Sequence, residues 1–528
     1  MYRILVSDKL GAAALDRLKE HADVTVDVKT GLSPEQLIDT IPDYDALIVR
    51  SGTQVTADVL AAGKKLRVVG RAGVGVDNID VKAATLHGVV VMNTPGANSI
   101  ATAELTLALM LAVSRNIPQA HASLLAGEWR RSDFVGSQLY RKVLGVVGFG
   151  RVGKLVAERA QAFGMEILAY DPAALEETAR DQGVLLVELD ELFAQSDYIT
   201  LHAAYNPSTA RLINADTIAQ MKDGVILINA ARGKLIDELA VADALRSGKI
   251  KAAAVDVYSS EPPPADHPLL GLPNVVHVPH LGASTREAER DVGIQIAGQV
   301  VAALRGTDFS YAVNMPFELT GGFAAARPYL ELAETLGRLH TGLADKPVRR
   351  LEIEVKGDVV GGLVRAIGAA LLKGVLEPTS DIAVNYINAP VLAHERNITT
   401  SQTIGINSLD YPNVIACRAV WDGGERLLAG VLFGGSEPRI VQVDGHRLEA
   451  RPEGVVLVMR NQDVPGVIGQ IGTILGAYGV NIGEWRLGRN KPGDEALSFI
   501  NLDSEPTAAV LDALREVKAI TQVKVVRL

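Results

Sequence analysis

The chain alternates short apolar runs rich in β-branched residues with segments of helical or polar pattern through about residue 280. Unbroken apolar runs of this length are typical of strands that are buried on both faces of a sheet. The first four runs lie at residues 4–7, 46–49, 68–71 and 89–91, and six more lie at 143–148, 166–170, 198–202, 225–229, 252–257 and 275–278. Such alternation predicts two α/β units, each a doubly wound, Rossmann-like parallel sheet with helices on both faces.

The pattern changes after residue 316. Leu319, Thr320, Gly321 and Gly322 are typical of a hinge, and the residues from there to about Glu453 mix helical and strand patterns. The last segment predicts strands at 455–460, 481–488, 496–502 and 520–526 and helices at 466–478 and 507–517. This βαββαβ order is that of a ferredoxin-like α+β domain.

The bulk composition is that of a multidomain globular protein. The 528 residues exceed what one core accommodates, and a domain size of ~150 residues predicts three or four domains. The chain has 48% hydrophobic and 22% charged residues, which is ordinary for soluble proteins. Its net charge of -10 argues against a nucleic-acid partner, because phosphate binding requires a basic face.

Cysteine usage and the N-terminus bear on the compartment. Cys417 is the one cysteine, so it forms no internal disulfide and builds no thiolate metal site, and we expect a small buried residue there. The chain enters a strand directly after Met1, and its longest apolar helix candidate, residues 105–113, is far shorter than the ~20 residues of a membrane span. We therefore expect a cytoplasmic protein with no membrane partner and no metal.

A predicted strand leads directly into a glycine-rich turn and a helix at residues 143–153. Gly148 permits a tight turn, Gly150 lets a pyrophosphate approach the backbone, and Gly153 lets the helix pack closely on the strand. The phosphates would lie at the helix N-terminus, where free amides favour negative charge. The next strand ends at Asp171, whose carboxylate can bind the adenosine ribose and repel a 2′-phosphate, so NAD is predicted over NADP. The alternative for Asp171 is an ordinary turn residue.

Three polar residues follow predicted strands at the end where ligands bind in parallel sheets: Arg232, Glu261 and His280. Oxidation of a secondary alcohol requires a base for the hydroxyl proton, and histidine titrates near neutrality. A carboxylate beside it can orient the ring, and a guanidinium can bind the substrate carboxylate through two hydrogen bonds. Each residue alone fits an ordinary surface role, but together behind a dinucleotide turn they predict a dehydrogenase.

These parts resemble the D-isomer-specific 2-hydroxyacid dehydrogenases. The matching parts are the glycine turn with Asp171, residues 229–233, Asp256 with Glu261 and Pro262, and residues 279–282. The resemblance implies that Arg232 binds substrate, Glu261 orients the histidine, and His280 is the acid/base. It also implies that NAD contacts the following residues: Gly148, Gly150, Arg151, Val152, Gly153, Asp171, Ala230, Arg232, Asp256, His280 and Gly282.

The resemblance further implies a discontinuous arrangement of domains. A substrate-binding domain would comprise residues 1–97 and 284–316, with an NAD-binding Rossmann domain, residues 98–283, inserted in it. An intervening regulatory domain, residues 317–453, and an ACT domain, residues 454–528, would follow. The active site would then lie in the cleft between the first two domains, where closure about a hinge excludes water.

Within the family, the chain is most similar to long members that act on a phosphorylated hydroxy acid. This implies oxidation of 3-phospho-D-glycerate to 3-phosphohydroxypyruvate with NAD, the first step of serine biosynthesis. The implied substrate contacts come from Arg50, Ser51, Val74, Gly75, Asn98 and Arg131. Arg50 stands where those enzymes bind the phosphate, and Arg131 is a second candidate; lactate would need neither cation. The alternative for Arg50 is a surface charge at a strand end.

The last unit resembles an ACT domain, which is a common amino-acid-sensing module. The resemblance implies L-serine as an effector between two such domains, contacts from Asn461, Asp463 and Asn481, and a homotetramer. Asn461 stands where some relatives have a bulkier residue. The alternative is a dimerisation module without an effector. In the intervening region, either an anion site or a solvated charged face accounts for Arg439, His446, Arg447 and Arg451.

Two other functions stay open at this point. One is a reductase of hydroxypyruvate, glyoxylate or another 2-oxo acid from the same family, and activity on unphosphorylated substrates would favour it. The other is a non-catalytic NAD-sensing scaffold, which the complete set of Arg232, Glu261 and His280 argues against.

Overall fold

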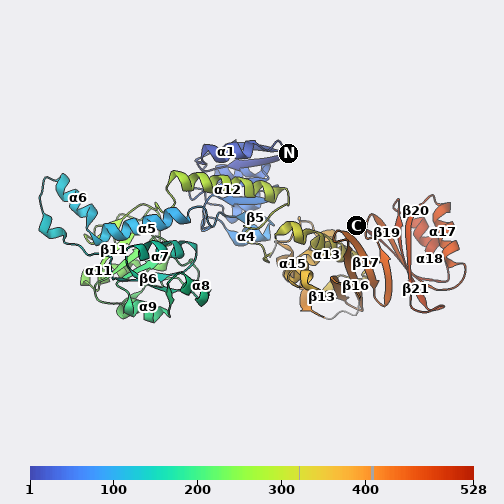
Figure 1. The fold of residues 1–528 in the computed structure, drawn as a ribbon. Helices are drawn as coiled ribbons and strands as arrows, with labels where there is room; N and C mark the ends of the chain where they lie inside the picture. The colour runs from blue at the N-terminus through green and yellow to red at the C-terminus, as the bar shows by residue number, and fades with distance from the viewer. Residues whose placement is uncertain (320–321, 406–409) are drawn as a thin grey trace.

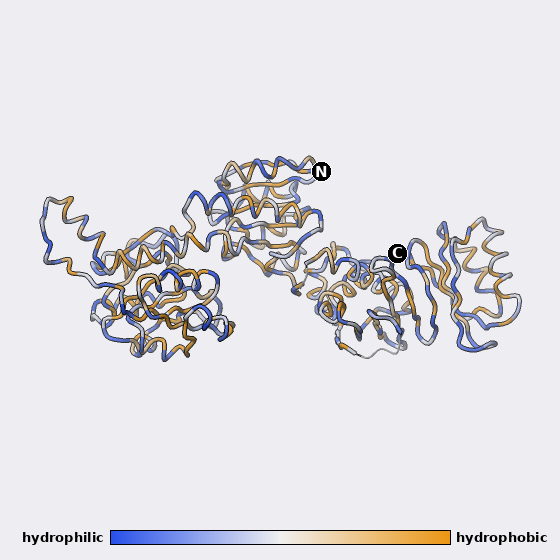
Figure 2. Tube along the Cα trace, in the orientation of Figure 1, coloured by the Kyte–Doolittle hydropathy of each residue, from blue (hydrophilic) through white to orange (hydrophobic). Residues whose placement is uncertain are grey.

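The computed structural model describes residues 1–319, 322–405 and 410–528, so Thr320 and Gly321 of the expected hinge lie outside the described residues. Four sheets follow one another along the chain, and Figure 1 shows them in an elongated molecule. The first sheet along the chain lies between the seven-stranded second sheet and the two C-terminal sheets (Figure 1). Figure 2 shows apolar residues concentrated along the strands and on the helix faces that cover them.

The first sheet has five parallel strands in the order β2-β1-β3-β4-β5. Its strands are β1 (Tyr2–Val6), β2 (Val24–Val28), β3 (Ala46–Val49), β4 (Val68–Arg71) and β5 (Val90–Met92), and its helices are α1 (Ala12–Lys19), α2 (Pro34–Thr40), η1 (Ile41–Asp43), α3 (Ala57–Ala62), α4 (Val81–Leu86) and α12 (Arg286–Leu304). The apolar runs predicted four of these strands. They did not predict β2, an edge strand in which Thr25 and Asp27 interrupt the apolar pattern.

Helix α12 covers one face of this sheet although it comes much later in the chain (Figure 1). A Cβ atom added at Gly70 on β4 would lie 2.4 Å from Val300 and 3.0 Å from Ile296, so the helix rests directly on the strand backbone. Both side chains are fully buried. Beyond the helix, Ala312 forms an antiparallel bridge to Met92 at the edge strand β5.

The second sheet has seven parallel strands in the order β12-β11-β10-β9-β6-β7-β8. Its strands are β6 (Val143–Val147), β7 (Glu166–Tyr170), β8 (Leu185–Leu186), β9 (Tyr198–Leu201), β10 (Val225–Asn229), β11 (Ile250–Val255) and β12 (Val275–His277), and its helices are α5 (Ser99–Ser114), α6 (Ile117–Leu125), η2 (Arg131–Phe134), α7 (Arg151–Ala162), α8 (Glu176–Asp181), α9 (Leu189–Gln195), α10 (Ala215–Gln220), η3 (Gly233–Leu235) and α11 (Glu238–Ser247). Two parallel sheets are thus confirmed. The sequence pattern missed only β8, which has two residues.

Helix α5 is a core helix of this second unit. Met110 and Ala103 are fully buried in it, and Asn98 precedes it without a side-chain cap hydrogen bond. Within the described ranges no single helix is long and apolar enough to cross a membrane. Among the residues that the structure describes, one pair of helices, α5 and α6, passes that test when taken together, and the pair is bent by 62°.

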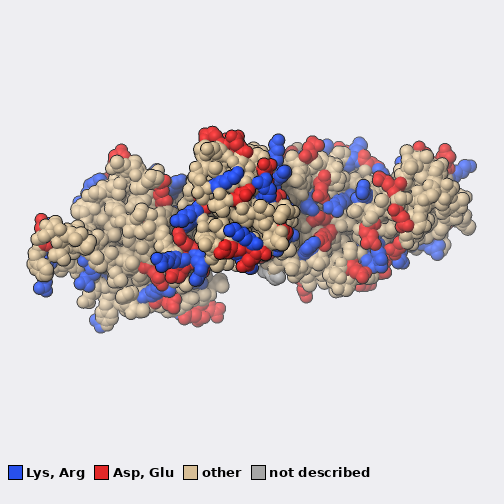
Figure 3. Space-filling model, turned by 90° about the horizontal axis from the view of Figure 1, so that it is seen from above, with Lys and Arg blue, Asp and Glu red and all other residues tan. Residues whose placement is uncertain are grey.

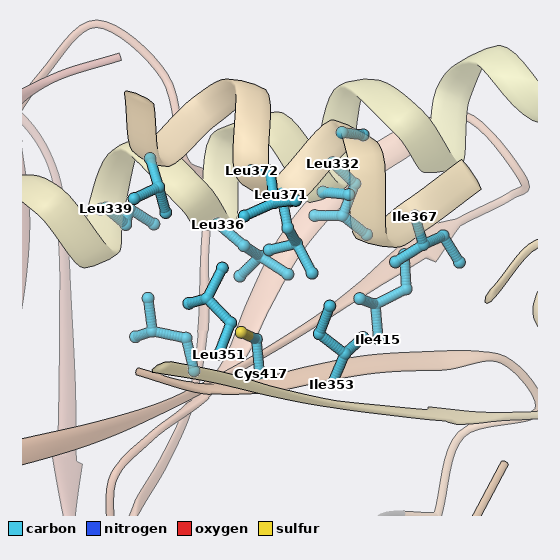
Figure 4. Packing of buried hydrophobic residues seen from close by; sticks show 14 of the residues in the cluster. Leu332, Leu336, Leu339, Leu351, Ile353, Ile367, Leu371, Leu372, Ile415 and Cys417 are labelled. Carbon is cyan, nitrogen blue, oxygen red and sulfur yellow. The ribbon is translucent and has the colours of Figure 1, made fainter. Parts of the chain in front are cut away.

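The third sheet is mixed and has the order β14-β13-β15-β16-β17-β18. Its elements are α13 (Phe323–Leu343), β13 (Val348–Lys356), α14 (Asp358–Gly361), α15 (Val364–Leu376), η4 (Glu377–Thr379), α16 (Ala389–Glu395), β14 (Thr399–Ile404), β15 (Val414–Trp421), β16 (Gly424–Phe433), β17 (Glu437–Val443) and β18 (His446–Ala450). Leucines from α13 and α15 pack on the sheet, and Cys417 lies among them as a small buried residue (Figure 4). Burial raises the pKa of its thiol.

The last sheet is antiparallel with the order β20-β21-β19-β22. Its elements are β19 (Val455–Gln462), α17 (Val467–Ala477), β20 (Ile482–Arg489), β21 (Glu495–Leu502), α18 (Ala508–Arg515) and β22 (Ile520–Arg527). The predicted βαββαβ order is therefore confirmed. Figure 3 shows acidic and basic side chains interspersed on the face that it presents.

Candidate active site

Three adjacent strands bring the predicted catalytic residues together. Arg232 follows β10, Glu261 follows β11 and His280 follows β12, and these strands are neighbours in the sheet. Because the carboxyl ends of parallel strands share one edge, the three side chains converge there. They line one cavity of about 590 Å³ together with residues of the first sheet's unit.

His280 and Glu261 form a close pair. The His280 Nδ1 atom lies 2.6 Å from Glu261 Oε2, and the other carboxylate oxygen accepts the backbone N–H of Tyr258 at 3.1 Å. Burial acts to raise the pKa of Glu261, but the bonds from His280 and Tyr258 outweigh burial and leave that pKa below its ordinary value. A charged carboxylate therefore accepts the Nδ1 proton, and Nε2 is the ring nitrogen left to accept a proton from a ligand.

The backbone of His280 is held in an uncommon conformation. Its φ of 54° is in the left-handed region, which a non-glycine residue rarely adopts. Buried Asp256 stabilises this turn, because its backbone carbonyl accepts the His280 N–H at 2.9 Å and its carboxylate accepts the amides of Leu281 and Gly282. Burial raises the pKa of Asp256, while those amides and the His280 ring oppose that rise. Asp256 thus fixes the turn on which His280 projects into the cavity.

Arg232 is positioned by contacts from both sides of the cavity. The side-chain amide of buried Asn229 donates to the Arg232 carbonyl at 3.0 Å, which fixes the backbone just after β10. The guanidinium donates to the Ala231 carbonyl and lies 3.2 Å from Asp77. A Cβ atom added at Gly75 would lie 2.1 Å from Arg232 Nη2, so only glycine allows this close approach.

Two further arginines line the same cavity from the ends of strands β3 and β4. Arg50, beside Ser51, is paired with Glu289 at 3.2 Å, and the Arg71 side chain donates to Asn78 at 3.0 Å. Burial lowers the pKa of Arg71 to about 10, and the nearby Arg232 charge acts in the same direction. The sequence did not single out Arg71 as a site residue. Its position directly at a strand end, like that of Arg50, is the signal that could have found it.

The glycine turn between β6 and α7 has the geometry that a dinucleotide requires. Gly148 has a φ of +95°, and a Cβ atom there would lie 2.5 Å from the Ala203 nitrogen. Gly153 packs its helix on the turn so closely that a Cβ atom would lie 2.1 Å from the Gly148 carbonyl oxygen. Nothing lies within 4 Å of the Cβ position at Gly150, which leaves the amides of the helix N-terminus accessible to a pyrophosphate. The residues present therefore fit NAD.

Asp171 lies at the end of β7 beside this turn. Its carboxylate accepts the Phe149 amide of the glycine turn at 2.9 Å and the Ala173 amide at 2.9 Å. It thus stabilises the local turn, as the alternative interpretation expected, and it lies beside the nucleotide-binding turn. Arg151 begins α7 and donates to the Pro95 carbonyl at 3.1 Å, which links the nucleotide unit to the segment before α5.

A second cavity of about 370 Å³ adjoins the glycine turn and shares residues with the first. The predicted residues that line it are Val74, Gly75, Asn98, Val152, Ala230, Arg232, Asp256, His280 and Gly282. His202 also lines it, but burial lowers the pKa of His202 far below its usual range. Of these two histidines, His280 is the one with a carboxylate on its Nδ1 atom.

Arg131 and the three predicted effector residues lie apart from the catalytic cleft, and the effector residues lie in the last domain. Arg131 lies on η2 beyond α6 and is not among the residues that line the two cavities within one chain. In the last sheet, Asp463 pairs with Arg489 at 2.8 Å, and this contact lowers the Asp463 pKa. The remaining predicted effector residues have partners of their own: Asn481 donates to Asp503 and Asn461 donates to the Gln462 carbonyl.

Three family models match successive parts of the chain. The NAD binding domain of D-isomer specific 2-hydroxyacid dehydrogenases matches residues 107–282. The D-3-phosphoglycerate dehydrogenase intervening domain matches residues 325–444, and the ACT domain matches residues 455–519. The first match contains the glycine turn, Arg232, Glu261 and His280.

Relatives match over the full length. D-3-phosphoglycerate dehydrogenase of Methanocaldococcus jannaschii is 44% identical, and that of Bacillus subtilis is 39% identical, each with 100% of both chains covered. Among solved structures, a glyoxylate reductase from Paecilomyes thermophila is 32% identical with a TM-score of 0.55, covering 59% of this chain and 98% of its own. The chain therefore belongs to the D-3-phosphoglycerate dehydrogenases, a branch of the NAD-dependent, D-isomer-specific 2-hydroxyacid dehydrogenase family.

Proposed function

We propose that this chain oxidises 3-phospho-D-glycerate to 3-phosphohydroxypyruvate with NAD and so begins serine biosynthesis. The observation that carries this proposal is a cavity in which Arg50, Arg71 and Arg232 lie with the His280–Glu261 pair. A substrate with a carboxylate at one end and a phosphate at the other requires cations at separate points around the reacting carbon. The full-length relatives named D-3-phosphoglycerate dehydrogenase support the same substrate.

The reaction removes a hydride and a proton from the C2 alcohol. When bound, NAD supplies the acceptor for the hydride. His280 Nε2 accepts the hydroxyl proton, since Nδ1 is occupied by Glu261, and the carboxylate stabilises the imidazolium that forms. Arg232 binds the substrate carboxylate and polarises the C2 oxygen, with the amides near Val74 and Gly75 as further donors.

The arginines on the first sheet's unit supply the phosphate site. Arg50 and Arg71 follow adjacent strands, and Ser51 adds a hydroxyl donor beside them. In this proposal, phosphate binding draws Arg50 away from its exposed ion pair with Glu289. Within one chain Arg131 lies away from this site, so in this proposal it contacts the phosphate only if another copy of the chain brings it to the cavity.

The test is NADH formation with 3-phospho-D-glycerate at alkaline pH with the product trapped. We expect turnover with the phosphorylated acid and at least ~10-fold lower kcat/KM with D-glycerate or D-lactate, since a charge-assisted contact contributes about 1.5–3 kcal/mol. Equal or better turnover of the unphosphorylated acids would instead indicate a 2-oxo-acid reductase. Absence of turnover with all of them, despite NAD binding, would favour a non-catalytic role.

The ACT domain is proposed to bind L-serine and to inhibit the enzyme without competing with substrate. Asp463, Asn461 and Asn481 would contact the effector where two such domains meet, in a homotetramer. Exposed apolar side chains support assembly, since Leu125 and Trp129 on the segment around α6 are 76% and 83% exposed. Light scattering of the purified chain tests the tetramer, and calorimetric titration with L-serine tests the effector.

A further inference from the structure

The loop from Tyr258 to Glu261 determines where the orienting carboxylate lies. Glu261 contacts His280 with one oxygen and its own loop, through the Tyr258 N–H, with the other. On one side the loop is pressed against η3, because a Cβ atom at Gly233 would lie 1.9 Å from the Tyr258 carbonyl carbon. The histidine therefore keeps its orientation only as long as this short backbone segment keeps its place.

Glu238 also holds this loop. Its carboxylate accepts the Ser259 backbone N–H at 2.8 Å and the Ser259 hydroxyl at 2.5 Å. The Glu238 side chain is only 12% exposed, although Ser259 itself is exposed. Glu238 is the first residue of α11, but Asp237 caps that helix by accepting the Ala240 amide. The helix cap therefore does not account for the Glu238 contacts.

His267 lies behind this carboxylate. Its side chain is 3% exposed, and its Nε2 atom is 3.1 Å from Glu238 Oε2. The Nδ1 atom accepts the Leu269 amide at 3.4 Å, and Nε2 makes a close polar contact with Glu238 that lacks the geometry of a hydrogen bond. The ring also packs edge-on against Tyr258, with 5.5 Å between the centroids. His267 thus contacts both the carboxylate and the loop that the carboxylate holds.

We propose that Glu238, supported by His267, is a positioning residue for the oxidation: it fixes the Tyr258–Glu261 loop so that Glu261 keeps His280 directed at the substrate hydroxyl. Glu238 is not among the residues that line either cavity described above, so it acts through Glu261 and not on the substrate. The inference rests on the proposed function, because it assumes that His280 is the base. It assigns a role to a conspicuous buried carboxylate that the reaction itself leaves unused.

The test compares Glu238→Ala with Asp243→Ala, which removes an exposed carboxylate from the same helix. Hydrogen–deuterium exchange of the free chain measures the protection of the loop's backbone amides directly. We expect Glu238→Ala to raise exchange in peptides that contain residues 258–261, since the Ser259 amide loses its acceptor, and Asp243→Ala to leave it unchanged. Unchanged exchange in Glu238→Ala would overturn the proposal, even for a chain whose proposed substrate proved wrong.

Kinetics then separate positioning from general stability. Because small misplacement of a catalytic group is costly, we expect Glu238→Ala to lower kcat about 10-fold while the KM for 3-phospho-D-glycerate changes less than about 2-fold. Combined with Glu261→Ala, it should cause no further loss, because both changes act through one contact. An equal 10-fold loss in both backgrounds would overturn the proposal. If Glu238→Ala does not fold, Glu238→Gln can be used, because its amide oxygen keeps one acceptor for Ser259. We expect this variant to lower kcat about 3-fold, and to cause no further loss when Glu261 is already replaced by Ala.

Discussion

The catalytic cleft and the predicted effector residues use their polar side chains differently within one chain. In the cleft, residues that follow three neighbouring strands of the second sheet line one cavity together with residues of the first sheet's unit. In the last domain, Asp463 is paired with Arg489 and Asn481 with Asp503. The cleft groups thus already surround one cavity, although Arg50 and Arg232 have ion-pair partners there, whereas Asp463 and Asn481 are paired with neighbours in their own domain. Because the groups of the cleft are preorganised, we expect mutations there to have strong effects. In the last domain an effector must replace existing partners, so we expect modest effects.

The largest effect is expected for His280→Ala, because the cleft would lose its base while its other groups stay in place. We expect kcat to fall by ~10²–10⁴ with the melting temperature little changed. Steady-state kinetics and thermal unfolding provide the measurement, with His394→Ala at an exposed position of α16 as the control. Turnover within about 3-fold of the parent would remove His280 from the mechanism.

The next effect tests the substrate side of the cleft. Arg50→Ala should lower kcat/KM for 3-phospho-D-glycerate by ~10–10² and leave activity toward D-glycerate nearly unchanged, because only the phosphate loses a charged donor. Arg17→Ala, at an exposed ion pair on α1, is the matched control. Equal losses of kcat/KM on both substrates would mean that Arg50 does not bind the phosphate.

Glu261→Gln tests the pair at the centre of the cleft. We expect kcat at neutral pH to fall about 10-fold, since the imidazolium loses its counter-charge. The contacts around Glu261 lower its pKa below the ordinary value of 4.5, so their contribution to stability is complete above that value and is lost as pH falls through the lower folded-state value. The parent should therefore lose stability faster than the variant between about pH 5 and pH 3. Parallel pH curves of melting temperature would contradict this.

The smallest effect is expected in the last domain. Asp463→Ala should weaken L-serine binding about 5-fold, because the removed carboxylate is only partly available to a ligand while it is paired with Arg489. Calorimetry measures the affinity, and Asp512→Ala on α18 controls for loss of an exposed carboxylate. Serine binding that survives Asp463→Ala unchanged would place the effector elsewhere.

The sequence predicted the parallel sheets and the cluster of Arg232, Glu261 and His280 because both follow from local pattern and from the rule that strand ends converge. It missed strand β2, whose short alternation of apolar and polar residues differs from the unbroken apolar runs of the central strands. It also gave no role to Arg71 or Glu238. Their contacts depend on how a loop, a helix start and a neighbouring strand meet in space, and that geometry is a property of the assembled fold.

Helix α12 also imposes an order on events during synthesis. The first sheet leaves the ribosome long before residues 286–304, yet Gly70 on β4 is covered by Ile296 and Val300 of that helix. Until that helix emerges, only α1 covers part of this apolar face, and the whole seven-stranded unit is translated in the meantime. The nascent chain must therefore carry an unfinished N-terminal unit through most of the translation of its catalytic half, and the apolar surface exposed during that period favours aggregation.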